Sequence, residues 1–191
     1  METRQQHIIK DSCNELQTWI ERLCKLDGCN KEELRAYFSQ NNMWVESLET
    51  FGSFMCNGAE SFIYKSYDEK EVYKIKLNRT GGINGFVNLL KDALNHNKVF
   101  PDTYYSLIGF SSYRKDLCVI LRQEYVRGEF ATNEQIQTHL MKDGFTLTST
   151  GREGEFLALK NGFQVTDIKS ANAIVANNRV YIIDCCVVKY E

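Results

Sequence analysis

The sequence predicts an α+β fold, and three observations support this prediction. Apolar residues recur at helical spacing in some segments and gather in short runs rich in Ile, Val, Phe and Tyr in others. The two kinds of segment do not alternate regularly, which argues against a repeated βαβ arrangement. The 191 residues are 43% hydrophobic, which is enough apolar material for one domain, or for one domain with an extension.

The first 48 residues predict a helical N-terminal extension. A first helix is indicated by an apolar stripe with spacings of four and three residues, made by Ile9, Cys13, Leu16, Ile20 and Leu23. Gly28 can end that helix. Asn30 followed by Glu33 resembles a capping box, which places a second helix over about residues 31–42. We expect these helices to pack on the rest of the chain; the alternative is a docking surface for a protein partner.

Residues 49–126 predict a β-rich lobe with one helix. The segment ESFIYKSYDEKEVYKIKL has two apolar runs around a polar connector, which is typical of a β-hairpin. Pro101 closes the helix that follows. In order, we expect a hairpin at 60–77, a helix at 83–99 and strands at about 105–112 and 117–126.

Residues 127–191 predict a smaller second lobe. Thr132 is expected to cap a helix over about residues 133–143. Short strands follow, and Asn161-Gly162 is a strong signal for a tight hairpin turn between two of them.

Composition and charge argue against several classes of protein. The formal net charge is −2, from 23 basic and 25 acidic residues, which gives no support to a nucleic-acid binder. No apolar run is long enough to cross a membrane, and the N-terminal residues lack the apolar centre of a signal peptide. The seven cysteines contain no C-x-x-C pair, which favours neither a zinc site nor a disulfide framework. We therefore expect a reducing, cytoplasmic location.

The polar residues that could carry chemistry gather in two parts of the chain. VTDIKSANAI places Asp167, Lys169 and Asn172 in the order D-x-K-x-x-N. The apolar strand VYII then leads to Asp184, and upstream the strand EVYKIKL carries Lys74. Phosphoryl transfer needs a base for the acceptor hydroxyl, oxygen ligands for Mg²⁺ and cations for the phosphates. The sequence offers a candidate for each role, whereas a D-x-K motif by itself is more often a solvated turn.

This set of residues resembles the signature of the eukaryotic-type protein kinases, which combines a strand lysine, a D-x-K-x-x-N loop and a later metal-binding aspartate. The chain is more similar still to the small kinase domain of polyvalent proteins in bacterial mobile elements and phages. The similar segments are NGAESFIYKS, VYKIKL, LNHNKVFPDTYYSLIGF, QEYVRG and VYIID, within residues 35–185. The resemblance implies a compact two-lobed protein-kinase-like fold over residues 49–191, with a truncated C-terminal lobe after the helical extension of residues 1–48.

The resemblance also implies a nucleotide site in the β-rich lobe. Lys74 would contact the α- and β-phosphates of ATP; Lys76 is the alternative, because alternation places it on the same face of the strand. Gly58 would let the backbone of a phosphate-covering hairpin approach the nucleotide closely. A hinge would pair its backbone groups with adenine, at Gln123, Glu124 and Tyr125.

In the second lobe the resemblance implies the catalytic and metal-binding groups. Asp167 would be the general base, and Lys169 would contact the γ-phosphate. Asn172 and Asp184 would bind Mg²⁺. The expected function is ATP- and Mg²⁺-dependent transfer of a phosphoryl group to a serine, threonine or tyrosine hydroxyl. The alternatives are a small-molecule kinase, a nucleotide-binding pseudokinase that acts as an interaction module, and a purely structural module.

The sequence departs from the kinase pattern at several positions. A full G-x-G-x-x-G is absent, and Cys185-Cys186 follow Asp184 in place of a glycine. The only acid of the expected helix is Asp92, which lies nearly opposite Leu90 on a helical wheel and so away from the strand lysine. The chain ends soon after Asp184, so we expect no activation segment and no helical platform for a peptide substrate.

Overall fold

The computed structural model describes residues 3–26, 28–58, 61–150 and 156–190. Contacts between Cα atoms divide the chain into two compact units, one of residues 1–94 and 104–125 and the other of residues 95–103 and 126–191. Both units combine helix and strand, which agrees with the predicted α+β class. The domain limits expected from the sequence stay a prediction.

Two capped helices open the first unit. α1 (Arg4–Leu23) begins with a capping box at Thr3, and α2 (Lys31–Gln40) begins with the predicted capping box at Asn30. The centre and end of the predicted α1 stripe are buried, at Leu16, Ile20 and Leu23. These side chains belong to the core that the helices share with the sheet, so the stripe packs within its own unit.

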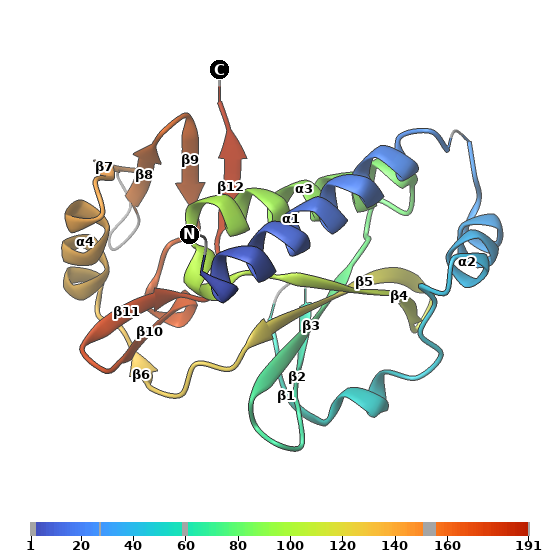
Figure 1. The fold of residues 1–191 in the computed structure, drawn as a ribbon, viewed down its shortest axis with the longest axis horizontal. Helices are drawn as coiled ribbons and strands as arrows, with labels where there is room; N and C mark the ends of the chain where they lie inside the picture. Colours follow the sequence, from blue (N-terminus) through green and yellow to red (C-terminus); the bar gives the residue numbers. More distant parts are fainter. Residues whose placement is uncertain (1–2, 27, 59–60, 151–155, 191) are drawn as a thin grey trace. The chain divides into compact units, whose positions relative to one another are not determined.

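The first unit is built on a five-stranded antiparallel sheet in the order β1-β2-β3-β5-β4 (Figure 1). Its strands are β1 (Ser53–Asn57), β2 (Ser61–Lys65), β3 (Glu71–Leu77), β4 (Ser106–Tyr113) and β5 (Asp116–Glu124). A short 3₁₀ helix, η1 (Leu48–Phe51), precedes β1. The predicted hairpin is confirmed as β2 and β3, and the two strands predicted after the helix are confirmed as β4 and β5.

One face of this sheet is covered by the helices. α3 (Ile83–Val99) has the predicted bounds; it begins in the first unit, and its last residues belong to the second. Phe86 of α3 packs with Phe38 of α2 and Phe110 of β4, where the rings of the last two stack. Figure 1 shows α1 and the start of α3 lying along each other beside the sheet. The opposite face carries a smaller apolar cluster that includes Ile75.

The second unit contains two small antiparallel sheets, ordered β11-β10-β6 and β12-β9-β8-β7, and the helix α4 (Asn133–Lys142). The strands are β6 (Glu129–Phe130), β7 (Thr146–Ser149), β8 (Phe156–Lys160), β9 (Phe163–Thr166), β10 (Ala173–Ala176), β11 (Arg179–Ile182) and β12 (Cys186–Lys189). Two predictions are confirmed here, the helix cap at Thr132 and the turn at Asn161-Gly162 between β8 and β9. Among the described residues, no helix has the length and apolarity needed to span a bilayer.

Candidate active site

Two connections between strands lie next to each other in the second unit. The β9–β10 connection (residues 167–172) carries Asp167, Lys169 and Asn172, and the β11–β12 connection (residues 183–185) carries Asp184. Because β9 pairs with β12 and β10 pairs with β11, the flanking strands bring both connections to one place. The carbonyl oxygen of Asn172 accepts the N–H group of the first residue after β11 at 2.9 Å and that of Asp184 at 3.4 Å. All four predicted residues of this lobe are therefore neighbours.

Asp167 lies at the centre of this cluster. Its φ of +57° is in the left-handed region, which non-glycine residues adopt rarely and which is enriched at functional sites. Lys169 Nζ is 2.6 Å from Asp167 Oδ1. Asn172 Nδ2 donates to Asp167 Oδ2 at 3.0 Å and to the Asp167 carbonyl oxygen at 2.8 Å. The carboxylate is thus held in one orientation while its side chain stays 54% exposed, so it can accept a proton from a hydroxyl group outside the cluster.

The ion pair between Lys169 and Asp167 is exposed on both sides. Exposed ion pairs of this kind contribute only about 0–1 kcal/mol to the free energy of unfolding, so this pair does little to stabilise the fold. An ammonium group beside a catalytic carboxylate can instead offset negative charge that develops on a transferred phosphoryl group.

Asn172 and Asp184 carry the amide and carboxylate oxygens that Mg²⁺ prefers as ligands. Asn172 donates from its Nδ2 to Asp167, so its amide oxygen is the atom of this side chain that could bind a metal ion. Asp184 Oδ1 accepts the backbone N–H of Cys185 at 3.1 Å, which orients the carboxylate. No group of three His, Cys, Asp or Glu side chains in the described ranges is arranged as a metal cage. Mg²⁺ commonly binds one or two protein oxygens together with water and substrate phosphates, so a two-ligand site suits it.

Lys74 lies in the first unit, on the sheet face that the helices cover. Its cross-strand neighbour Leu121 belongs to the helix-covered core. Lys74 is 4% exposed, and its Nζ donates to the phenolic oxygen of Tyr105 at 2.8 Å. A buried ammonium group is unfavourable without polar partners, and the phenol offsets part of that cost. It also fixes the position of the ammonium group.

Lys76 lies two residues along β3 on the same face. Its Nζ is 3.8 Å from Asp92 Oδ2 of α3. The helical-wheel expectation that Asp92 points away from the strand lysine is therefore wrong for Lys76: Asp92 borders the buried Ala93, and the long lysine side chain reaches this flank of the helix. For Lys74 it stays a prediction. The Tyr105 ring centre lies 5.0 Å from Lys74 Nζ and 5.7 Å from Lys76 Nζ, so both lysines stay candidates for the phosphate contact.

The expected hinge comprises the last two residues of β5 and the residue after it. Gln123 lies opposite Val72 of β3 and is buried, whereas Glu124 is exposed. The N–H of Tyr125 donates to the carbonyl oxygen of Lys70 at 2.8 Å. While that hydrogen bond persists, this N–H group cannot pair with adenine.

Gly58 lies where the chain turns between β1 and β2. Its N–H donates to the carbonyl oxygen of Ser61 at 2.8 Å, and residues 59–60 of the same turn lie outside the described residues. A Cβ at position 58 would lie 3.4 Å from Ser61 Oγ, which is ordinary contact. Space within the turn therefore does not require glycine here, and an approach to a nucleotide stays a prediction.

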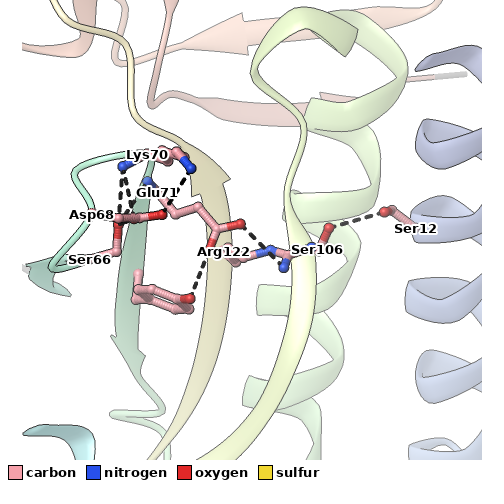
Figure 2. A network of polar contacts seen from close by, with 8 residues as sticks. Ser12, Ser66, Asp68, Lys70, Glu71, Ser106 and Arg122 are labelled. Carbon is pink, nitrogen blue, oxygen red and sulfur yellow. Dashed lines mark hydrogen bonds and ion pairs between the residues drawn. The ribbon is translucent and has the colours of Figure 1, made fainter. Parts of the chain in front are cut away.

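A hollow of about 410 Å³ lies in the first unit beside the hinge residues. Its lining includes Glu71 and Arg122, whose charged groups are 3.3 Å apart (Figure 2). Since side chains alternate along a strand, Arg122 points to the face opposite that of Leu121 and Lys74. Gln123 also lines the hollow and lies, by the same alternation, on the face of Leu121 and Lys74, so the lining draws on both faces of the sheet. Burial and the hydrogen bond from Tyr73 to Glu71 raise the pKa of Tyr73 to about 12.

The sequence gives Tyr105 and His96 no role in the candidate site, although both lie in the segment LNHNKVFPDTYYSLIGF. Tyr105 carries one usable signal, because it is two residues from Leu107, and strand alternation therefore predicts a buried position for both. His96 is 1% exposed near the end of α3, and its hydrogen bond to Thr103 has no counterpart in any local pattern.

The chain matches a described family over most of its length. A model of the family described as "Serine/Threonine/Tyrosine Kinase found in polyvalent proteins" matches residues 27–190. No curated protein and no solved structure matches the chain. The matched range contains Lys74 and Lys76 in the first unit and the cluster around Asp167 in the second.

Proposed function

Because the chain belongs to the serine/threonine/tyrosine kinase family found in polyvalent proteins, we propose that it transfers the γ-phosphoryl group of ATP to a hydroxyl group in a Mg²⁺-dependent reaction. The observation that carries this proposal is the cluster in which Asp167 binds both Lys169 and Asn172. The cluster combines a base, a cation and oxygen ligands, which are the groups that phosphoryl transfer requires of a protein.

Each residue of the cluster has a distinct part in the proposed reaction. The acceptor oxygen forms a bond to the γ-phosphorus while its proton passes to the Asp167 carboxylate. The bond between that phosphorus and the bridging oxygen breaks, and ADP leaves. Lys169 offsets the negative charge on the transferred group. When bound through Asn172 and Asp184, Mg²⁺ would neutralise charge on the phosphates.

The first unit would hold the remainder of the nucleotide. Lys74 is the proposed contact of the α- and β-phosphates, and its hydrogen bond to Tyr105 supports a fixed position for the ammonium group. The family's description favours a serine, threonine or tyrosine hydroxyl as the acceptor.

Metal-dependent nucleotide binding is the first test of this function. ATP should raise the melting temperature more in Mg²⁺ than in EDTA. Asp184→Asn should remove the Mg²⁺-dependent part of this rise, because the carboxylate charge is lost. Asp11→Asn is the control: Asp11 is an exposed aspartate on α1. An identical shift in Mg²⁺ and EDTA would contradict a metal-bridged triphosphate.

Transfer itself is measured with γ-labelled ATP, generic protein acceptors and a panel of small molecules that carry hydroxyl groups. Label on a protein acceptor, or on the chain itself, supports the proposal. Label only on a small molecule would identify a small-molecule kinase. Metal-dependent ATP binding without transfer to any acceptor would favour a pseudokinase that acts through its shape.

A further inference from the structure

A buried polar cluster in the second unit lies against the β11–β12 connection, which carries Asp184. It contains His96 near the end of α3, Thr103 of the 3₁₀ helix η2 (Pro101–Thr103), and Cys185. His96, Thr103 and Cys185 are 1%, 2% and 5% exposed. Polar groups at this depth are unfavourable unless they are hydrogen-bonded, so their partners show what the cluster holds in place.

The hydrogen-bond directions in this cluster follow from its acceptors. His96 Nε2 is 3.0 Å from the carbonyl oxygen of Thr103, and a carbonyl oxygen only accepts, so Nε2 carries the hydrogen. In the neutral ring Nδ1 is then an acceptor, and it lies 3.4 Å from Cys185 Sγ. The thiol therefore donates to His96. Thr103 Oγ1 lies 2.6 Å from the carbonyl oxygen of Ile182 and donates to it.

These bonds hold the chain on both sides of Asp184. Thr103 binds the carbonyl group of Ile182, the last residue of β11, and His96 binds the side chain of Cys185, the first residue after Asp184. Between these two anchors, the N–H of Ile183 donates to the carbonyl oxygen of Asn172 at 2.9 Å. The segment that presents the Asp184 carboxylate is thus anchored before it, within it and after it.

We propose that His96 and Thr103 are positioning residues that hold Asp184 where it can bind the metal ion together with Asn172. This inference rests on the proposed function. Apolar side chains of similar size would fill the same volume without the cost of burying polar groups, whereas these two bind the segment that carries the predicted ligand. Partners that orient a metal ligand typically change metal affinity by about 10–100-fold when they are removed.

The chain offers a closely matched control for a Thr103 variant. Ser111 of β4 is also 2% exposed, and its Oγ also donates to a backbone carbonyl oxygen, that of Val45, at 2.6 Å. Thr103→Val and Ser111→Ala each remove one buried hydroxyl-to-carbonyl bond. Both variants should lose a similar part of the free energy of unfolding, so a general loss of stability affects the two alike.

The test measures Mn²⁺ affinity by electron paramagnetic resonance, with the full chain and a non-hydrolysable ATP analogue. Thr103→Val should weaken Mn²⁺ binding about tenfold or more, while Ser111→Ala stays within about twofold of the wild type. Hydrogen exchange of the Ile183 amide gives a second readout that needs no metal. Its protection should fall in Thr103→Val and stay unchanged in Ser111→Ala.

A second pair of variants tests the His96 anchor. Cys185→Ser keeps a donor for Nδ1 and should keep most of the Mn²⁺ affinity, whereas Cys185→Ala removes the donor and should lower the affinity as Thr103→Val does. Equal Mn²⁺ affinity in Thr103→Val and Ser111→Ala, or in the serine and alanine variants of Cys185, would overturn the positioning role. A wild-type chain that binds no Mn²⁺ with the analogue would instead contradict the proposed function, and the positioning of a metal ligand would fall with it.

Discussion

The ammonium group of Lys74 lies 2.8 Å from the phenolic oxygen of Tyr105, and both side chains are buried. The kinase pattern pairs the strand lysine with an acid from the following helix. In this chain the acid of that helix, Asp92, lies 3.8 Å from the neighbouring Lys76. On one sheet face, the Lys74 ammonium group bonds to the Tyr105 hydroxyl and the Lys76 ammonium group lies near Asp92, so mutation of each lysine can test its role separately.

We expect Lys74→Ala to abolish transfer from ATP, because it removes the proposed contact of the α- and β-phosphates. Lys76→Ala should keep most of the transfer. Both variants are assayed with γ-labelled ATP at saturating Mg²⁺. The reverse order of activities would show that Lys76 is the phosphate contact and that Asp92 takes the part of the helix acid.

Tyr105→Phe tests the partner of Lys74 without removing the ring. A hydrogen bond to a charged group contributes about 1.5–3 kcal/mol, so its loss should weaken ATP binding by about tenfold or more when calorimetry is used to measure it. Tyr104→Phe is the matched control, since it removes the same atom from the adjacent residue. Equal affinities in the two variants would mean that Tyr105 does not position Lys74 for the nucleotide.

The helices were predictable because their signals are local. Asn30 and Thr132 begin capping boxes, and the structure has α2 and α4 starting directly after them. Turns were predictable for the same reason: Asn161 and Gly162 both adopt the positive φ that the hairpin between β8 and β9 requires. The adjacency of the two connections that carry Asp167 and Asp184 was expected only from the kinase resemblance.

The rest of the site depends on contacts between distant segments. Tyr105 meets Lys74 only because β4 and β3 flank β5 in one register, which no residue pattern specifies. The contact between Asp92 and Lys76 was not expected, because a helical wheel takes no account of the length of the partner's side chain. The long lysine side chain reaches the flank of the helix. His96 bonds to Cys185, which lies 89 residues later, so no sequence pattern around His96 predicts this contact.

Asp167→Asn should separate nucleotide binding from chemistry. Asparagine preserves the shape of the side chain and removes the negative charge, so ATP should still bind while transfer falls by roughly 10²–10⁴-fold. Calorimetry measures the binding and γ-labelled ATP measures the transfer. Asp184→Asn should instead weaken Mg²⁺-ATP binding. A transfer rate left unchanged in Asp167→Asn would rule out the general-base role and reduce the kinase resemblance to one of fold.

Burial raises the pKa of the Cys118 thiol to about 12, while the cysteine side chains of Cys24, Cys56 and Cys186 are exposed. A thiol reagent at pH 8 should therefore modify the three exposed cysteines in the folded protein and leave Cys118 unmodified until the chain is denatured. Rapid labelling of Cys118 under native conditions would contradict its place in the core between the sheet and η1.

The same shift predicts how stability depends on pH. In the unfolded chain the Cys118 thiol loses its proton around the ordinary pKa of 9.0. In the folded chain the thiol stays protonated above that pH, because its pKa is raised. The stabilising contribution is therefore complete below pH 9 and is lost as the pH rises from 9 towards 12. Urea unfolding at pH 8 to 10.5 should show a steeper decline for the wild type than for Cys118→Ala. Cys56→Ala, which removes an exposed thiol, should keep the wild-type slope. Parallel slopes in all three proteins would mean that the Cys118 thiol ionises as easily in the folded state as in the unfolded chain.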